Sequence, residues 1–112
     1  MEYKPMQGDI IFLNFDPQIG HEQRGRRPAL VVSNNTFNSF TSIAVVCPIT
    51  NTNRQIPIHV SLDNRTKTTG VVMCDQVKSL DINMRNAEFV EKISEDILEE
   101  VIDILVGFVE IE

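Results

Sequence analysis

The sequence lacks the features that mark membrane, secreted and metal-binding proteins. No apolar run reaches the roughly 18 residues that a membrane-spanning helix needs. Residues 1–5 have neither the apolar core nor the cleavage signal of a secretory leader. The two cysteines, Cys47 and Cys74, have a spacing unlike that of metal ligands. These absences predict a cytoplasmic protein without a membrane segment and without a metal site built on cysteine.

Both cysteines lie in apolar, strand-like stretches of the chain. In such a setting free cysteine behaves as a small hydrophobic residue, and a reducing compartment keeps it as a thiol. We therefore interpret Cys47 and Cys74 as reduced, buried residues. A redox-sensitive pair is the alternative, if the two strands are neighbours.

The chain is short, and its negative charge is unevenly spread. With 112 residues it is expected to form a single domain, residues 1–112, and 42% hydrophobic residues suit a globular protein. The net charge is -6, but residues 88–112 hold nine acidic residues and one lysine, so residues 1–87 carry +2. This distribution argues against a protein that coats DNA non-specifically, while it leaves room for a local positive surface that binds a few phosphates.

Hydrophobic patterning predicts several short strands followed by one helix. The connections are too short to hold helices between parallel strands, so we expect a mainly antiparallel α+β or barrel-like domain. The polar stretch 34–42 is expected to be turn-like, with Phe37 and Phe40 fixing it to the core. A helix beginning at Ser94 is expected to pack on the sheet and to lie near a subunit interface. The expected strands are Asp9–Phe15, Pro28–Ser33, Ile43–Ile49, Ile56–Leu62, Gly70–Val77 and Ala87–Ile93.

The loop from Gly20 to Pro28 concentrates more chemistry than any other stretch of the chain. Arginine presents a rigid fork of donors to phosphate oxygens, and histidine and glutamate are common proton carriers. Pro28 also holds the preceding residue in an extended conformation. The loop therefore predicts a site that binds and reacts with a phosphodiester. Its chemically active residues are His21, Glu22, Gln23, Arg24, Arg26 and Arg27.

The sequence has no glycine-rich phosphate loop, no His-x-Glu or Cys-x-x-Cys metal signature and no Gly-x-Ser-x-Gly elbow. Without metal ligands or a cofactor, the phosphodiester chemistry that remains is attack by a ribose 2′-hydroxyl on the adjacent phosphate. That reaction needs a base, cations that stabilise the phosphorane and an acid for the leaving oxygen. It acts on RNA and not on DNA, since DNA has no 2′-hydroxyl.

Two more distant segments offer further polar groups at strand ends. Thr50 follows the third expected strand, and Asp75 and Gln76 lie near the end of the fifth, just before Lys78. The fifth strand is thus expected to deliver a carboxylate and an amide to the same rim of the sheet. His59 alternates outward in its strand and is expected to be exposed; Pro57, in the same strand, indicates an edge position or a bulge.

Four motifs, in order along the chain, resemble the MazF/PemK (Kid) family of toxin–antitoxin endoribonucleases. The resemblance implies an SH3-like barrel, shared with the gyrase poison CcdB, and a homodimer. It also implies sequence-specific, metal-independent cleavage of single-stranded RNA to a cyclic phosphate and a 5′-hydroxyl. A cognate antitoxin would inhibit the protein and link it to operator DNA only indirectly. The motifs are Gly8–Ile11, the stretch from Phe15 to Val31, Cys47–Thr50, and Thr69–Val72 with Cys74–Asp81.

The resemblance also assigns roles to particular residues. MazF-type members use the arginine before the proline and the third-strand threonine, which correspond to Arg27 and Thr50. Kid-type members use the loop histidine and the late aspartate, which correspond to His21 and Asp75. Kid has a further arginine where this chain has Met73, so Arg27 is the stronger candidate.

The expected division of labour is that Arg27 stabilises the phosphorane and Thr50 orients the phosphate. Glu22 or Asp75 is the base, and His21 is the acid or a second stabilising group. Contacts with RNA are expected from Gln23, Arg24, Arg26, Gln76 and Lys78. The alternative is a protein-binding toxin similar to CcdB, or a catalytically inactive relative that only binds an antitoxin. A nucleotide-binding regulator is disfavoured by the missing phosphate loop.

Overall fold

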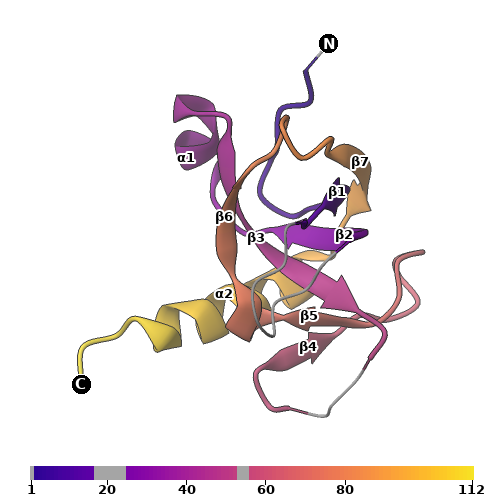
Figure 1. Cartoon of the computed structure of the whole chain (residues 1–112). Helices are drawn as coiled ribbons and strands as arrows, with labels where there is room; N and C mark the ends of the chain where they lie inside the picture. The colour runs from indigo at the N-terminus through magenta and orange to yellow at the C-terminus, as the bar shows by residue number, and fades with distance from the viewer. Residues whose placement is uncertain (1, 17–24, 53–55) are drawn as a thin grey trace.

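The computed structural model describes residues 2–16, 25–52 and 56–112, which form a bent antiparallel sheet with a helix packed against it (Figure 1). Two α-helices, α1 (Asn35–Phe40) and α2 (Glu95–Phe108), and a short 3₁₀ helix η1 (Cys74–Gln76) accompany the strands. No helix in these ranges is long and apolar enough to cross a membrane. The strands are β1 (Asp9–Asn14), β2 (Arg26–Val31), β3 (Ile43–Thr50), β4 (His59–Ser61), β5 (Val71–Met73), β6 (Lys78–Asp81) and β7 (Glu88–Lys92).

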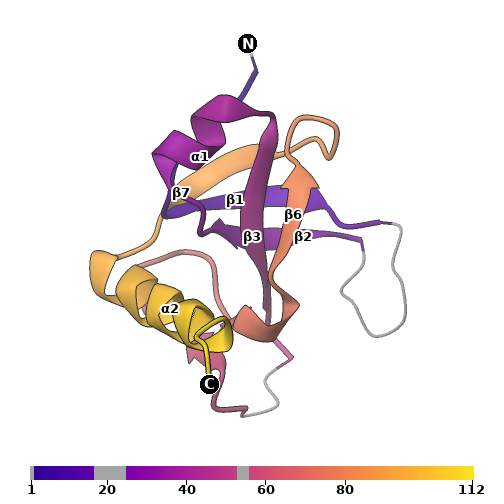
Figure 2. The same ribbon diagram turned by 90° about the vertical axis from the view of Figure 1, so that its left-hand side faces the viewer.

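β3 is the strand on which the sheet is organised. The strand order is β4-β5-β3-β2-β1-β7, and β6 pairs with β3 outside this path. β6 lies along the first half of β3, β5 lies along its last two residues, and all pairings are antiparallel. Figure 2 shows β3 and β6 running across β1 and β2, so the sheet is strongly bent. The expected mainly-β α+β class with a C-terminal helix is confirmed.

The bent sheet buries apolar side chains on both of its faces. Successive residues of β1 belong to different clusters, Ile10 to the one that contains α2 residues and Ile11 to the other. This alternation follows from the two-residue period of a strand. Each fully buried aliphatic side chain contributes about 1.5–3 kcal/mol, and both clusters draw on β1, β2 and β3. These three strands therefore hold the two hydrophobic clusters together.

Helix α2 follows the amphipathic pattern in its sequence. Its buried residues, Ile97 and Val101, pack on the sheet, as predicted. Ser94 is the N-cap residue with extended backbone, although its side chain makes no capping hydrogen bond. Arg65 bridges Asp63 and Asp96 and so ties the loop after β4 to the first turn of α2. The last turns of the helix extend away from the sheet in Figure 1.

The expectation that 34–42 is a turn pinned by two phenylalanines is wrong. Asn34 accepts a hydrogen bond from the amide of Phe37 and caps α1. The helix turns the Asn38 amide inward, where it donates to the carbonyls of Ser33 and Pro5. The flanking aromatic side chains consequently face outward, with Phe37 41% and Phe40 78% exposed.

The expected strand from Gly70 to Val77 is also only partly correct. β5 ends at Met73, η1 follows, and β6, which was not predicted, then pairs with β3. The two pairings with β3 have registers three residues apart: Ile49 lies opposite Val72 in one, and Val46 opposite Lys78 in the other. The 3-residue η1 takes up this offset.

The expected strand from residue 56 to 62 is likewise shorter than predicted. Regular pairing in β4 begins only at His59, two residues after Pro57, which has no N–H to donate. β4 stands at one end of the strand order, so the edge position is confirmed.

Candidate active site

Arg27 and Thr50, residues from two distant motifs, lie on the neighbouring antiparallel strands β2 and β3. The β2–β3 ladder pairs Ala29 with Pro48 and Leu30 with Cys47. Arg27 lies two residues before Ala29 and Thr50 two residues after Pro48, so both lie just beyond the paired part of this ladder, at the same end of the two strands. Thr50 is nearly buried, and its hydroxyl accepts a hydrogen bond of 3.1 Å from the amide of Thr52. Arg27 is partly buried.

Gly70 fixes the backbone at Thr50 from the other side. Its φ of +114° lies in the region that L side chains rarely adopt, and an added Cβ would lie 2.2 Å from the Thr50 carbonyl oxygen. A neighbouring hydrogen bond of 3.0 Å joins the Thr69 hydroxyl to the Asn51 side chain. The Thr69–Val72 motif and the Cys47–Thr50 motif are therefore in direct contact.

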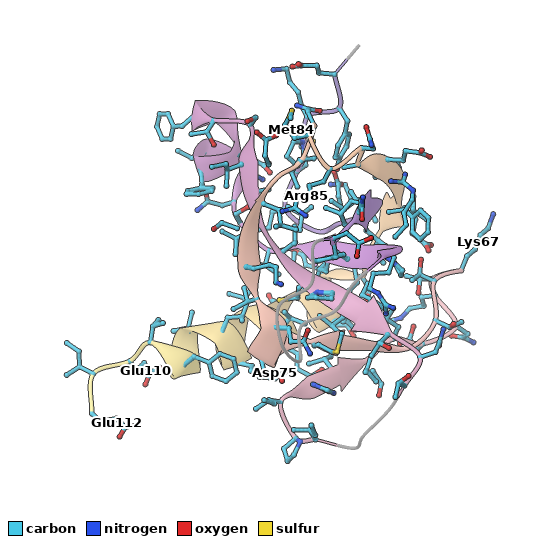
Figure 3. All side chains as sticks on the ribbon, in the orientation of Figure 1. Lys67, Asp75, Met84, Arg85, Glu110 and Glu112 are labelled. Carbon is cyan, nitrogen blue, oxygen red and sulfur yellow. The ribbon has the colours of Figure 1, made fainter. Side chains whose placement is uncertain are left out.

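Asp75 lies at the opposite end of the β4–β5 hairpin from the loop that carries Lys67 (Figure 3). It is the central residue of η1, and its side chain is 37% exposed. The Oδ1 atom of Asp75 lies 2.8 Å from Nε2 of His59. The sequence pattern predicted that a strand would deliver this carboxylate, whereas a 3₁₀ turn does so.

The prediction that His59 is exposed is wrong, because its side chain is only 5% exposed. Strand alternation was correctly inferred, since its neighbour Val60 faces the hydrophobic cluster. The other face of β4 is covered at this point by η1, an element that the sequence did not reveal. The contact between His59 and Asp75 spans 16 residues, and no local motif marks it.

The structure separates Arg26 from Arg27. The two residues are consecutive in β2, so their side chains leave on opposite faces. The Arg26 guanidinium lies 3.0 Å from the Glu88 carboxylate and 5.0 Å from the centre of the Phe12 ring. Its predicted contact with RNA would therefore have to compete with an ion pair and a cation–π contact.

The other predicted RNA contacts lie in η1, just after it, or outside the described residues. Gln76 ends η1 and is partly buried. Lys78 begins β6 and places its Nζ 5.9 Å from the centre of the Phe15 ring. Four candidates from the first loop lie outside the residues that the structure describes: His21, Glu22, Gln23 and Arg24.

The two cysteines are free, and both are buried, as the sequence indicated. β3, which carries Cys47, pairs with β5, and Cys74 follows β5 directly. A hydrogen bond with Cys74 and burial raise the pKa of the Cys47 thiol, which keeps it protonated. The condition for the redox-sensitive alternative, neighbouring strands, is thus met, and the alternative itself stays a prediction.

Potential metal ligands do not gather in the part of the chain that the structure describes. No group of three or more His, Cys, Asp and Glu side chains has a metal-binding arrangement there. The expectation that the protein uses no metal stays a prediction.

The fold is that of a small toxin domain. Residues 6–108 match the family model of the PemK-like, MazF-like toxins of type II toxin–antitoxin systems. The chain belongs to this family, as its four motifs predicted.

Curated relatives and solved structures agree with this membership. Over 100 residues the chain is 41% identical to endoribonuclease PemK of Escherichia coli, covering 86% of this chain and 75% of the relative. It is 39% identical over 85 residues to the endoribonuclease toxin MazF of Escherichia coli strain K12, covering 76% of each. The crystal structure of MazF from Deinococcus radiodurans matches with a TM-score of 0.90 and 40% identity, covering 96% of this chain and 97% of that one. A chain of the MazE–MazF crystal structure from the same organism matches with a TM-score of 0.84 and 33% identity, covering 99% of this chain and 100% of that one.

Proposed function

We propose that this chain is an endoribonuclease toxin that cleaves single-stranded RNA at specific sequences without a metal ion. The 2′-oxygen of the ribose attacks the adjacent phosphorus, and the bond from phosphorus to the 5′-oxygen breaks. The products are a cyclic phosphate and a 5′-hydroxyl. The observation that carries the proposal is that Arg27 and Thr50 lie at the same end of the neighbouring strands β2 and β3, in a chain whose relatives include the endoribonucleases PemK and MazF.

Arg27 and Thr50 act on the phosphate. Negative charge grows on the non-bridging oxygens as the phosphorane forms, and preorganised donors aimed at that charge lower the barrier. The Arg27 guanidinium presents two parallel donors to these oxygens. The Thr50 hydroxyl, held in a nearly buried position, donates a third hydrogen bond and orients the phosphate.

Proton transfer is assigned to the carboxylates and the loop histidine. Asp75 or Glu22 accepts the proton of the 2′-hydroxyl, and His21 protonates the leaving 5′-oxygen or stabilises the phosphorane. Asp75 is the described member of this set, and its partly exposed carboxylate can reach substrate.

We also propose two protein partners, a second copy of this chain and a cognate antitoxin. Membership of a toxin–antitoxin family supports the antitoxin, which would connect the toxin to operator DNA indirectly. Large exposed apolar side chains that follow one another along one segment support contacts with protein, because contiguous exposed apolar surface marks interaction sites. Such side chains occupy the last turn of α2 and the residues after it: Val106, Phe108, Val109 and Ile111.

Digestion of a long RNA by the purified protein, with a chelator present, tests the proposed activity. We expect discrete fragments with 5′-hydroxyl ends from the wild-type protein. Thr50→Val, which keeps the shape and removes the hydroxyl, should slow cleavage on the order of 100-fold. Thr36→Val, at an exposed position in α1, is the matched control and should cleave normally. Intact RNA with the wild-type protein would instead favour a protein-binding toxin or an inactive relative.

A further inference from the structure

His59 and Asp75 form a side-chain pair whose members have very different environments. Nε2 of His59 lies 2.8 Å from Oδ1 of Asp75. The imidazole is 5% exposed, whereas the carboxylate is 37% exposed. The ring is thus too deeply buried to bind substrate, while the group that it holds can meet RNA.

The ring is held in place by the strand that carries it. His59 pairs with Met73 in the β4–β5 ladder, and its amide donates a hydrogen bond of 2.9 Å to the carbonyl of Ile56. Asp75, by contrast, lies on a 3-residue 3₁₀ turn. A short turn constrains a side chain less than a paired strand does, so the orientation of the carboxylate depends on what it contacts.

The contacts of the two ring nitrogens indicate which of them carries the hydrogen when the ring is neutral. A carboxylate only accepts hydrogen bonds, so Nε2 carries the hydrogen of the neutral ring and Nδ1 keeps a lone pair. Within the described residues, Nδ1 is buried and has no hydrogen-bond partner. Burying such a nitrogen is unfavourable, so packing alone favours an apolar side chain here, and the bond to Asp75 is what the histidine adds.

From this arrangement we infer that His59 is a positioning residue: it fixes one oxygen of Asp75 and thereby aims the carboxylate at the 2′-hydroxyl of the RNA. This inference rests on the proposed function, because it assumes that Asp75 takes part in proton transfer. The hydrogen bond from His59 engages Oδ1, so Oδ2 is the oxygen that receives the proton. His59 touches neither substrate nor the reacting atoms.

Three substitutions distinguish a positioning role of His59 from a purely structural one. His59→Leu removes the donor and keeps an apolar side chain in the buried position. We expect kcat to fall on the order of tenfold or more, as partial loss of a general base requires, with KM changed less than threefold. His59→Gln keeps an N–H donor and should recover most of this loss. Ser61→Ala, two residues along β4 and exposed, is the control and should leave both constants unchanged.

A double-mutant cycle with Asp75→Asn separates positioning from folding. In the Asp75→Asn protein the base is already lost, so adding His59→Leu should slow the residual reaction by less than twofold. A further tenfold loss in that background would show that the histidine acts on the fold, which overturns the inference. The ¹⁵N chemical shifts of the His59 ring give a readout without activity, and hydrogen on Nδ1 rather than Nε2 would also contradict it.

The outcomes distinguish this inference from the function on which it rests. Intact RNA with the wild-type protein would overturn the proposed function together with the inference. Full activity in Asp75→Asn would remove Asp75 from the mechanism and the inference with it, while leaving RNA cleavage intact. Loss of activity in Asp75→Asn with full activity in His59→Leu would overturn the inference alone.

Discussion

Gly70 lies against the carbonyl group of Thr50, so closely that a Cβ atom at position 70 would stand 2.2 Å from the carbonyl oxygen. The contact joins the residue before β5 to the last residue of β3. Because Thr50 is a proposed site residue, the glycine supports the site through its contact with the backbone of Thr50.

The variant Gly70→Ala should therefore lose both stability and activity. It combines a left-handed backbone position with overlap against main-chain atoms, and such substitutions cost about 2 kcal/mol or more. Urea denaturation measures the loss. Gly25→Ala is the control, because Gly25 also has a positive φ but has no atom within 4 Å of the added Cβ. Equal stability of the two variants would show that the contact with Thr50 is unimportant.

The ion pair between Arg65 and Asp96 predicts a change in stability at acid pH. Hydrogen bonds from Arg65 lower the pKa of Asp96 to about 2 from its ordinary value of 3.8. A lowered pKa in the folded state gives stability that is present above the unfolded pKa and is lost as the pH falls through the folded value. The difference in the free energy of unfolding between wild type and Arg65→Gln should therefore shrink as the pH falls from about 4 to about 2.

Titration of Asp96 by NMR measures this directly. In the wild-type protein we expect the midpoint near 2, and in Arg65→Gln a return toward 3.8. The same midpoint in both proteins would contradict the assignment. Both side chains are exposed, so high salt should weaken the difference.

In α1 the polar Asn38 is buried and the aromatic Phe40 is exposed, so substitutions at these two positions should have unequal effects on stability. Phe40→Ser should change the free energy of unfolding by no more than about 0.5 kcal/mol, since Phe40 is exposed. Asn38→Ala should cost about 1–3 kcal/mol, because it leaves the carbonyls of Ser33 and Pro5 without their donor. Thermal or urea unfolding compares the two. A larger loss from Phe40→Ser would restore the expectation that this ring packs in the core.

Both cysteines should be unreactive in the folded protein. Cys47 and Cys74 are both fully buried, which keeps a reagent away from either thiol, and the raised pKa of Cys47 also opposes formation of its own thiolate. A chromogenic thiol reagent should modify them only after unfolding in urea. Fast modification of the native protein would instead favour the redox-sensitive alternative.

Regular patterns in the sequence predicted the parts of the fold that depend on local periodicity. The alternation around Ile11 and Leu13 marks β1, and the helical stripe through Ile97 and Val101 marks α2. Thr50 at the end of β3 was located from the strand that precedes it. In these cases the buried residues recur at the regular period of a strand or a helix, so a short stretch of sequence is enough to predict the element.

What the sequence did not reveal depends on tertiary contacts. The turn η1 and strand β6 exist because β3 accepts two partners in different registers, and apolar residues such as Val77 fit a strand equally well. The helix α1 is short, and its inward residue is the polar Asn38. The burial of His59 follows from η1 and could not be inferred without it. Arg27 and Thr50 were joined only through family resemblance, because they lie on different strands and no local pattern links them.

The most direct test of the account is the rate of RNA cleavage by Arg27→Lys. Lysine keeps the charge but loses the paired donors that match two phosphate oxygens, so we predict a fall in kcat on the order of 100-fold or more, with the unfolding temperature unchanged. Lys67→Gln, at the far end of the β4–β5 hairpin (Figure 3), removes a cation away from the site and should cleave at the wild-type rate. Near-normal cleavage by a folded Arg27→Lys protein would contradict the central claim that this guanidinium stabilises the phosphorane.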